Sequence, residues 1–289
     1  MVRRAVAHGA NGASTTLMWV GRAAWSLVGL AAPWAVLGEG RSGAVGVTAN
    51  VWGWGAWLAV LVALFVPSAL SLTAVRIIVP AVAVAGLWSA EPASVGTALF
   101  ALVVLSSRDV ADVLVQGSAY GAETRFVLRT PVPYLVPAVL VWAALVCATV
   151  GGTLLLAAGN LVAGIPVAAA GAVLAWRVPL RLHRLSRRWL VAVPAGLVVH
   201  DHLVLAETFM VRRNHLGPVT LARAAGDEAD LTGAVPGRRV TVSMTQPDKV
   251  VLSPITMRTL GTSQALHVVS FAVAPLRAGA AAAAVSAGR

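Results

Sequence analysis

The stretch that decides the fold class is residues 135–156, LVPAVLVWAALVCATVGGTLLL, an apolar run without an acidic or basic side chain. A helix that crosses the hydrocarbon core of a bilayer, about 30 Å thick, needs roughly 20 apolar residues. Other apolar runs lie before and after it, at residues 17–37, 51–65, 75–88, 94–105 and 161–176. We therefore expect an α-helical polytopic membrane bundle of about six spans. A signal peptide is the competing interpretation of the first run.

The arginines of residues 1–188 indicate the orientation of these spans. When the apolar runs are read as alternating crossings, one membrane face receives Arg3, Arg4, Arg22, Arg76, Arg108, Arg125, Arg129, Arg177, Arg181, Arg184, Arg187 and Arg188. The opposite face receives Arg41. Because positive side chains stay on the cytoplasmic side during insertion, we expect a multi-pass protein of the cell membrane with both termini cytoplasmic.

The composition agrees with a membrane location. Hydrophobic residues make up 58% of the 289 residues and charged residues 11%, whereas soluble domains average about a quarter charged. In a soluble protein the net charge of +11 would suggest nucleic acid. Most of the excess lies before residue 189, so we expect the lipid bilayer as partner and no nucleic acid. The expected lipid-surface contacts are Arg129, Arg177, Arg181, Arg184, Arg187 and Arg188.

From Trp189 onward the pattern predicts β-structure. Short β-branched and aliphatic segments alternate with turn residues, and Pro194, Ala195 and Gly196 form a tight hairpin turn. About eight strands lead to an Ala-rich tail, which is either a short helix or a frayed end. We therefore divide the chain into a transmembrane helical domain, residues 1–188, and a small all-β cytosolic domain, a barrel or sandwich, at residues 189–289.

Two segments carry a resemblance to a known group. Residues 187–207, RRWLVAVPAGLVVHDHLVLAE, and residues 120–126, YGAETRF, resemble uncharacterised integral-membrane proteins of high-GC Gram-positive bacteria that end in a cytosolic β-domain. The resemblance implies this architecture and no established activity. In strand count and closing helix the β-region also resembles bacterial PH-like domains. Its first hairpin lacks the cations with which PH domains bind phosphoinositides.

The clearest cluster of possible metal ligands is His200, Asp201 and His202. Two imidazoles two residues apart on a strand share a face and could begin a metal site. A turn capped by the aspartate explains the triplet as well. Since the single cysteine, Cys147, lies within an apolar run and no signature spacing is present, we expect no metal and no cofactor.

Acids and arginines between the apolar runs are the catalytic candidates. Asp109, Asp112, Glu123 and Arg125 fall in inner segments, where an enzyme acting on a lipid-linked substrate would place acids for proton transfer and an arginine for phosphate. The alternative is a juxtamembrane loop whose opposite charges neutralise one another.

Three functional hypotheses follow. The leading one is a membrane anchor, with a scaffold or regulatory role, that presents its β-domain to a protein partner. A membrane-embedded enzyme is the second. A small-solute permease is the third, and it is disfavoured because the spans carry no ionisable side chain at mid-depth to couple an ion.

Overall fold

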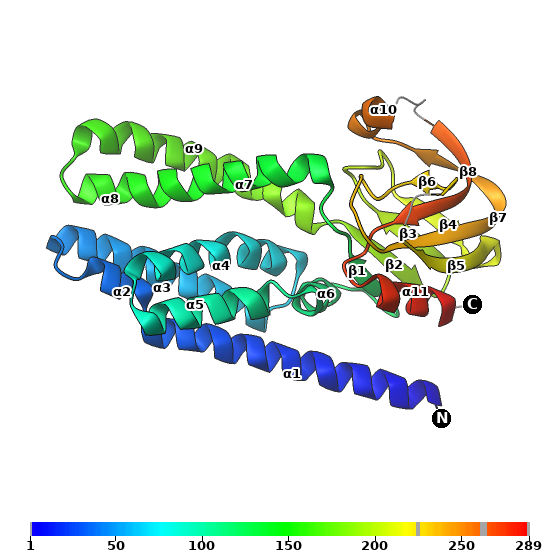
Figure 1. The fold of residues 1–289 in the computed structure, drawn as a ribbon, viewed down its shortest axis with the longest axis horizontal. Coiled ribbons are helices and arrows are strands. Elements are labelled where there is room, and N and C mark those ends of the chain that lie inside the picture. The colour runs from blue at the N-terminus through cyan, green and yellow to red at the C-terminus, as the bar shows by residue number, and fades with distance from the viewer. Residues whose placement is uncertain (1, 224–225, 261–264, 288–289) are drawn as a thin grey trace. The chain divides into compact units, whose positions relative to one another are not determined.

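The computed structural model describes residues 2–223, 226–260 and 265–287, which form two compact units (Figure 1). The helical unit contains the described residues of Met1–Gly117 and Ala138–His183. The β-unit contains those of Ser118–Pro137 and Arg184–Arg289. Compared with the expected division at residue 188, a segment from the inner loop is thus part of the β-unit.

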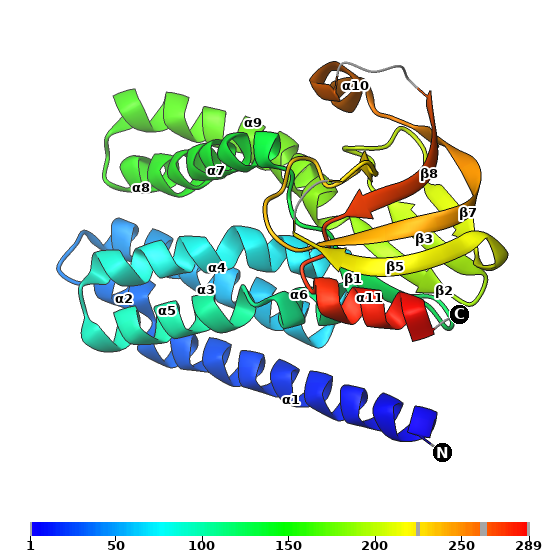
Figure 2. The ribbon, with the colours of Figure 1, turned by 45° about the vertical axis from the view of Figure 1, so that its right-hand side comes forward.

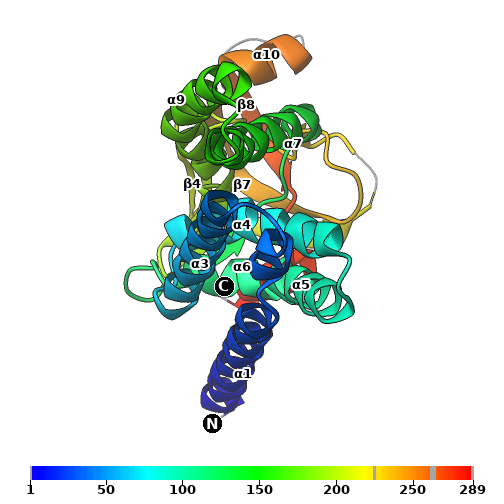
Figure 3. The ribbon, with the colours of Figure 1, turned by 90° about the vertical axis from the view of Figure 1, so that its left-hand side faces the viewer.

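The helical unit consists of consecutive helices joined by short turns (Figures 1 and 3). Its elements are α1 (Val2–Ala31), α2 (Pro33–Gly38), α3 (Gly43–Phe65), α4 (Ala69–Ser89), α5 (Pro92–Leu105), α6 (Arg108–Gln116), α7 (Val132–Val146), the π-helical turn η1 (Cys147–Gly151), α8 (Gly152–Ala157) and α9 (Leu161–Ser186). The first residues of α7 and the last of α9 belong to the β-unit.

Five segments of the described chain are long and apolar enough to cross a membrane. They are Ser14–Gly38, Gly43–Phe65, Ala69–Ser89, Val132–Ala157 and Leu161–Ser186. The fourth expected span is the shorter helix α5, whose 14 residues rise roughly 21 Å. The N-terminal part of the chain is therefore helical, as expected, with five such segments and one short apolar helix.

Serine side chains begin three of these helices. Ser42, Ser68 and Ser107 precede α3, α4 and α6, and each accepts a hydrogen bond from a backbone N–H of the first helical turn. Because Ser107 starts a new helix, α6 is separate from α5. Pro33 and the left-handed backbone of Ala32, with φ 39°, interrupt the first span without a side-chain cap.

Small residues allow the helices to pack closely. A Cβ added to Gly171 in α9 would lie 2.7 Å from the carbonyl oxygen of Ala148, and one added to Gly53 in α3 would overlap the Trp34 ring. Trp25 and Trp57 donate their indole N–H groups to each other's carbonyl oxygens, at 2.8 and 3.0 Å. Gly171 thus lets α9 approach the backbone of η1 closely.

The β-unit contains two four-stranded sheets (Figure 2). The first has the order β1 (Thr124–Val127), β2 (Trp189–Val193), β3 (Gly196–His200) and β4 (Phe209–Arg212). The second has the order β5 (Leu216–Ala222), β7 (Arg239–Val251), β8 (Ala265–Val273) and β6 (Ala229–Asp230). All neighbours pair antiparallel except β6 and β8. Strand β1 precedes Trp189 and so lies outside the region in which the sequence predicted β-structure. The register between β7 and β8 is irregular between Ser243 and Asp248.

One hydrophobic core joins both sheets to the C-terminal helix. Phe209 of β4 meets Phe271 of β8 edge to face, with ring centroids 5.2 Å apart. Helix α11 (Ala278–Ala287) adds Ala281 and Val285 to this core. The Ala-rich tail is therefore an ordered helix. A second helix, α10 (Pro254–Leu260), was not expected.

Candidate functional site

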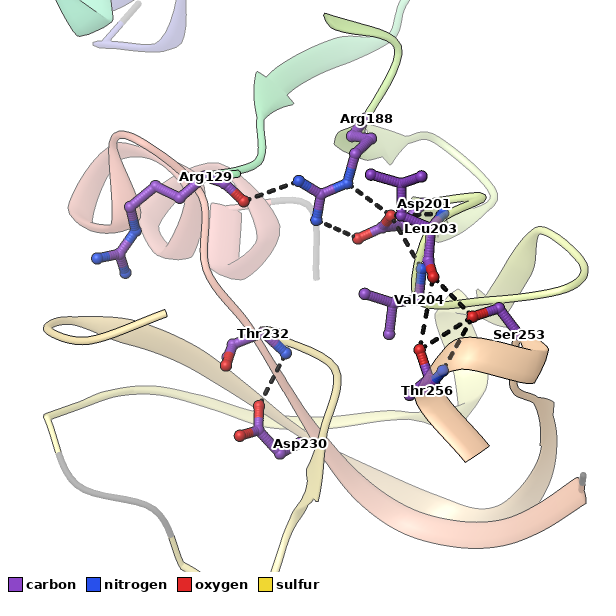
Figure 4. Close-up of polar contacts among 9 residues, drawn as sticks. All are labelled: Arg129, Arg188, Asp201, Leu203, Val204, Asp230, Thr232, Ser253 and Thr256. Atoms are coloured by element: carbon purple, nitrogen blue, oxygen red, sulfur yellow. Dashed lines mark hydrogen bonds and ion pairs between the residues drawn. The ribbon is translucent and has the colours of Figure 1, made fainter. Parts of the chain in front are cut away.

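A buried ion pair lies where α9 leads into β2 (Figure 4). The guanidinium of Arg188 donates to both carboxylate oxygens of Asp201, at 2.6 and 2.5 Å, and to the carbonyl oxygen of Arg129 at 2.8 Å. Both paired side chains are 1% exposed. This arrangement ties together the ends of β1, α9 and β3. Such burial is incompatible with the expected contact of Arg188 with the lipid surface.

Asp201 also shapes the turn that follows β3. Its Oδ1 accepts the backbone N–H groups of Leu203 and Val204, at 3.2 and 3.3 Å. Ser253, just before α10, donates its hydroxyl to the carbonyl oxygen of Leu203 at 2.6 Å (Figure 4). The aspartate of the His-Asp-His triplet therefore points inward and caps a turn, which is the second interpretation of this sequence.

A row of side chains crosses the first sheet on its surface: Arg125, Trp189, His200 and His202, here called the aromatic row. The guanidinium carbon of Arg125 lies 5.0 Å from the Trp189 ring centroid. Trp189 stacks on His200, its register partner, at 5.3 Å and 21°, and His202 follows at 6.2 Å. Cation–π and stacking contacts of this kind orient the four groups on three adjacent segments.

The surroundings of both histidines lower the pKa of the imidazole, mainly through burial. Burial lowers the pKa of His200, Arg187 and Arg125 lower it further, and Asp201 partly offsets them. Burial likewise lowers the pKa of His202, with His200, Arg188 and Arg184 adding to the effect against Asp201. Burial is therefore the main cause of both shifts, and nearby positive groups add to it.

The candidate catalytic residues belong to both units. Asp109, which is exposed, and Asp112, which is buried, belong to α6 of the helical unit. Glu123 and Arg125 belong to the β-unit, where they form an ion pair at 2.6 Å. In the β-unit, Glu123 and Arg125 thus follow the alternative interpretation of the sequence, in which opposite charges neutralise one another.

The arginines expected at the lipid surface differ in their surroundings. Arg177, Arg181, Arg184 and Arg187 are exposed. Arg129 is half-buried and donates to the carbonyl oxygens of Pro236, at 2.6 Å, and Arg238, so it holds the loop before β7. Sequence inspection could not separate these roles because all six arginines lie close to apolar runs.

Several polar groups of the helical unit join helices. Arg22 donates to the carbonyl oxygen of Leu64 at 3.0 Å and lies over the Phe65 ring, which caps the end of α3. Thr73 and His183 form a hydrogen bond of 2.7 Å between α4 and α9. An open depression beside α3, about 580 Å³ in volume, is lined by residues that include Arg41 and Trp54.

In the described part of the chain, no group of three or more His, Cys, Asp or Glu side chains lies close enough to hold a metal ion. Comparisons with protein-family models, with curated proteins and with solved structures find no match to this chain. Function is therefore inferred from the chain's own residues.

Proposed function

We propose that this chain is an integral membrane protein whose helical unit anchors the β-unit, and that the β-unit binds a protein partner in a scaffold or regulatory role. The observation that carries the proposal is the contrast between the units. The helical unit exposes large apolar side chains such as Leu30, 83% exposed, and Val162, 91% exposed, whereas the β-unit buries a core of its own. An apolar surface of this kind suits lipid and is unfavourable in water.

The orientation rests on the arginine pattern and on α5. Helix α5 runs antiparallel to α4 within the helical unit (Figure 1), so a sixth crossing would continue the alternation of directions. A helix shorter than the hydrocarbon core can cross where the bilayer thins locally. Six crossings place both termini on the arginine-rich, cytoplasmic face.

Binding is favoured over catalysis by how the charged groups are used. The ion pair of Arg188 with Asp201, both 1% exposed, fixes the fold of the β-unit, and the candidate acid Glu123 is paired with Arg125 at 2.6 Å. The β-unit instead presents isolated apolar side chains on its surface, at Met210, Ile255 and Val269. Methionine is among the residues enriched in protein interfaces, and the buried centre of an interface is more apolar than its rim.

The test uses the full-length chain in its native membrane. A photo-crosslinking amino acid replaces Met210, Ile255 or Val269 in turn, and exposed polar Thr245 serves as the control position. We expect a discrete crosslinked protein from at least one apolar position and none from Thr245. If every variant reaches the membrane and none yields a discrete product, the β-unit is not a protein-binding module.

A further inference from the structure

We infer that the aromatic row, together with Arg184 and Arg187, binds the phosphate of an anionic phospholipid headgroup. The inference rests on the proposed membrane placement, but it does not require a protein partner. Its site is one face of the β-unit, formed by the last turn of α9 and by the residues of β1, β2 and β3 that carry the row.

Charge is the first reason. Two acids near the row are already neutralised, Glu123 by Arg125 at 2.6 Å and Asp201 by Arg188 at 2.5 Å. Arg184 and Arg187 are exposed, and in the described part of the chain no acid forms an ion pair with either. The face thus keeps an excess of about two positive charges, which an anion would neutralise.

Geometry is the second reason. Stacking holds Trp189 and His200 in fixed orientations, and the hydrogen bond between His200 Nδ1 and Thr208 Oγ1, at 3.1 Å, fixes the imidazole ring. Two arginines and two imidazoles can all donate hydrogen bonds to phosphate oxygens. Donors that are already oriented lose less conformational entropy when a ligand binds.

Chain connectivity selects a lipid as the source of the phosphate. Arg187 follows directly after α9, which ends at Ser186 and is long and apolar enough to cross a membrane. Trp189 is three residues beyond the end of this helix. A segment that leaves a transmembrane helix enters the headgroup layer, where tryptophan is enriched and anionic lipids concentrate.

Binding at this face must be coupled to protonation. An anion close to His200 and His202 stabilises their imidazolium forms, because it offsets the positive charges of the surrounding arginines, which are Arg125, Arg184, Arg187 and Arg188. By reciprocity, acidification must strengthen the binding of the anion. If the headgroup raises the pKa of one histidine by about one unit, protonation of that histidine strengthens headgroup binding about tenfold.

The test measures histidine pKa values by NMR in the full-length protein labelled at histidine. Nanodiscs contain phosphatidylcholine alone or a mixture with phosphatidylglycerol, and His200→Gln and His202→Gln variants assign the signals. We expect phosphatidylglycerol to raise the pKa values of His200 and His202 more than that of His267, an exposed histidine on β8. The larger shift of His200 and His202 must disappear in the Arg184→Gln/Arg187→Gln variant. In this variant the signals of the other histidines report that the fold is retained.

Three results would overturn the inference. Equal shifts of all three histidines would mean that only the general surface potential acts, and an excess that survives the double arginine replacement would exclude these arginines. Inorganic phosphate added to phosphatidylcholine nanodiscs forms the third arm. If millimolar phosphate reproduces the full shift, the ligand is a free anion and not a lipid. None of these outcomes depends on the crosslinking result, so the two proposals fail separately.

Discussion

Replacing Asp201 with Asn tests how strongly the buried ion pair holds the β-unit together. Asparagine keeps the shape and an oxygen that can accept the N–H groups of Leu203 and Val204, so the substitution isolates the charge. It leaves the Arg188 guanidinium, 1% exposed, without its counter-charge. Breaking a buried pair from one side costs about 3–5 kcal/mol.

Hydrogen exchange in the full-length protein measures this loss. If the amides of β2 and β3 exchange through unfolding of the β-unit, their rates must rise roughly a hundredfold to a few thousandfold, since about 1.4 kcal/mol corresponds to a factor of ten. The control is Glu123→Gln, which removes the ion pair with Arg125, whose two side chains are 15% and 16% exposed. We expect the contribution of this pair to stability to be closer to that of a surface ion pair, about 0–1 kcal/mol.

The expected order is therefore a large effect for Asp201→Asn and a small one for Glu123→Gln. If Asp201→Asn accelerates exchange no more than the control, the pair is not desolvated, and the role assigned to Arg188 is wrong. The double variant Arg188→Leu/Asp201→Leu must recover part of the loss, because it removes the isolated charge.

Two further outcomes follow from the same structure. Because the pKa values of His200 and His202 are lowered in the folded state, the unfolded β-unit binds more protons, so stability present above about pH 6.5 is lost as pH falls. Thermal unfolding in zwitterionic detergent at pH 7.5 and 5.5 must show this slope, and His200→Gln/His202→Gln must flatten it. Gly53→Ala forces a methyl group into the Trp34 ring and should lower stability by about 1–3 kcal/mol, measured as a lower unfolding midpoint in detergent. Gly55→Ala, which meets no atom within 4 Å, is the matched control, and equal midpoints for the two variants would contradict the packing described.

The sequence predicts the helical unit well because each helix leaves a local signature. The run at residues 135–156 lies within the candidate span Val132–Ala157, and the hairpin at Pro194–Gly196 forms between β2 and β3 as expected. Apolar length and turn residues act over short distances along the chain. Elements that depend only on such signals are therefore recognised.

What the sequence did not reveal depends on contacts between distant residues. Strand β1 has four residues and exists because Arg125 and Phe126 pair with Val191 and Leu190. Arg188 looks like its exposed neighbours Arg184 and Arg187 until Asp201 is placed beside it. The aromatic row combines residues from positions 125 to 202. No local pattern could have indicated these neighbours, because register and pairing are set by the tertiary fold.

The most direct measurement of the central claim is the side of the membrane on which three engineered cysteines react. In a Cys147→Ser background, Arg41→Cys, Ala158→Cys and Thr245→Cys each provide one exposed thiol. In intact cells, an impermeant maleimide must label the cysteines at positions 41 and 158, and must label the one at 245 only after permeabilisation. Labelling of position 245 from outside, or labelling of positions 41 and 158 from opposite sides, would contradict six crossings with a cytoplasmic β-unit.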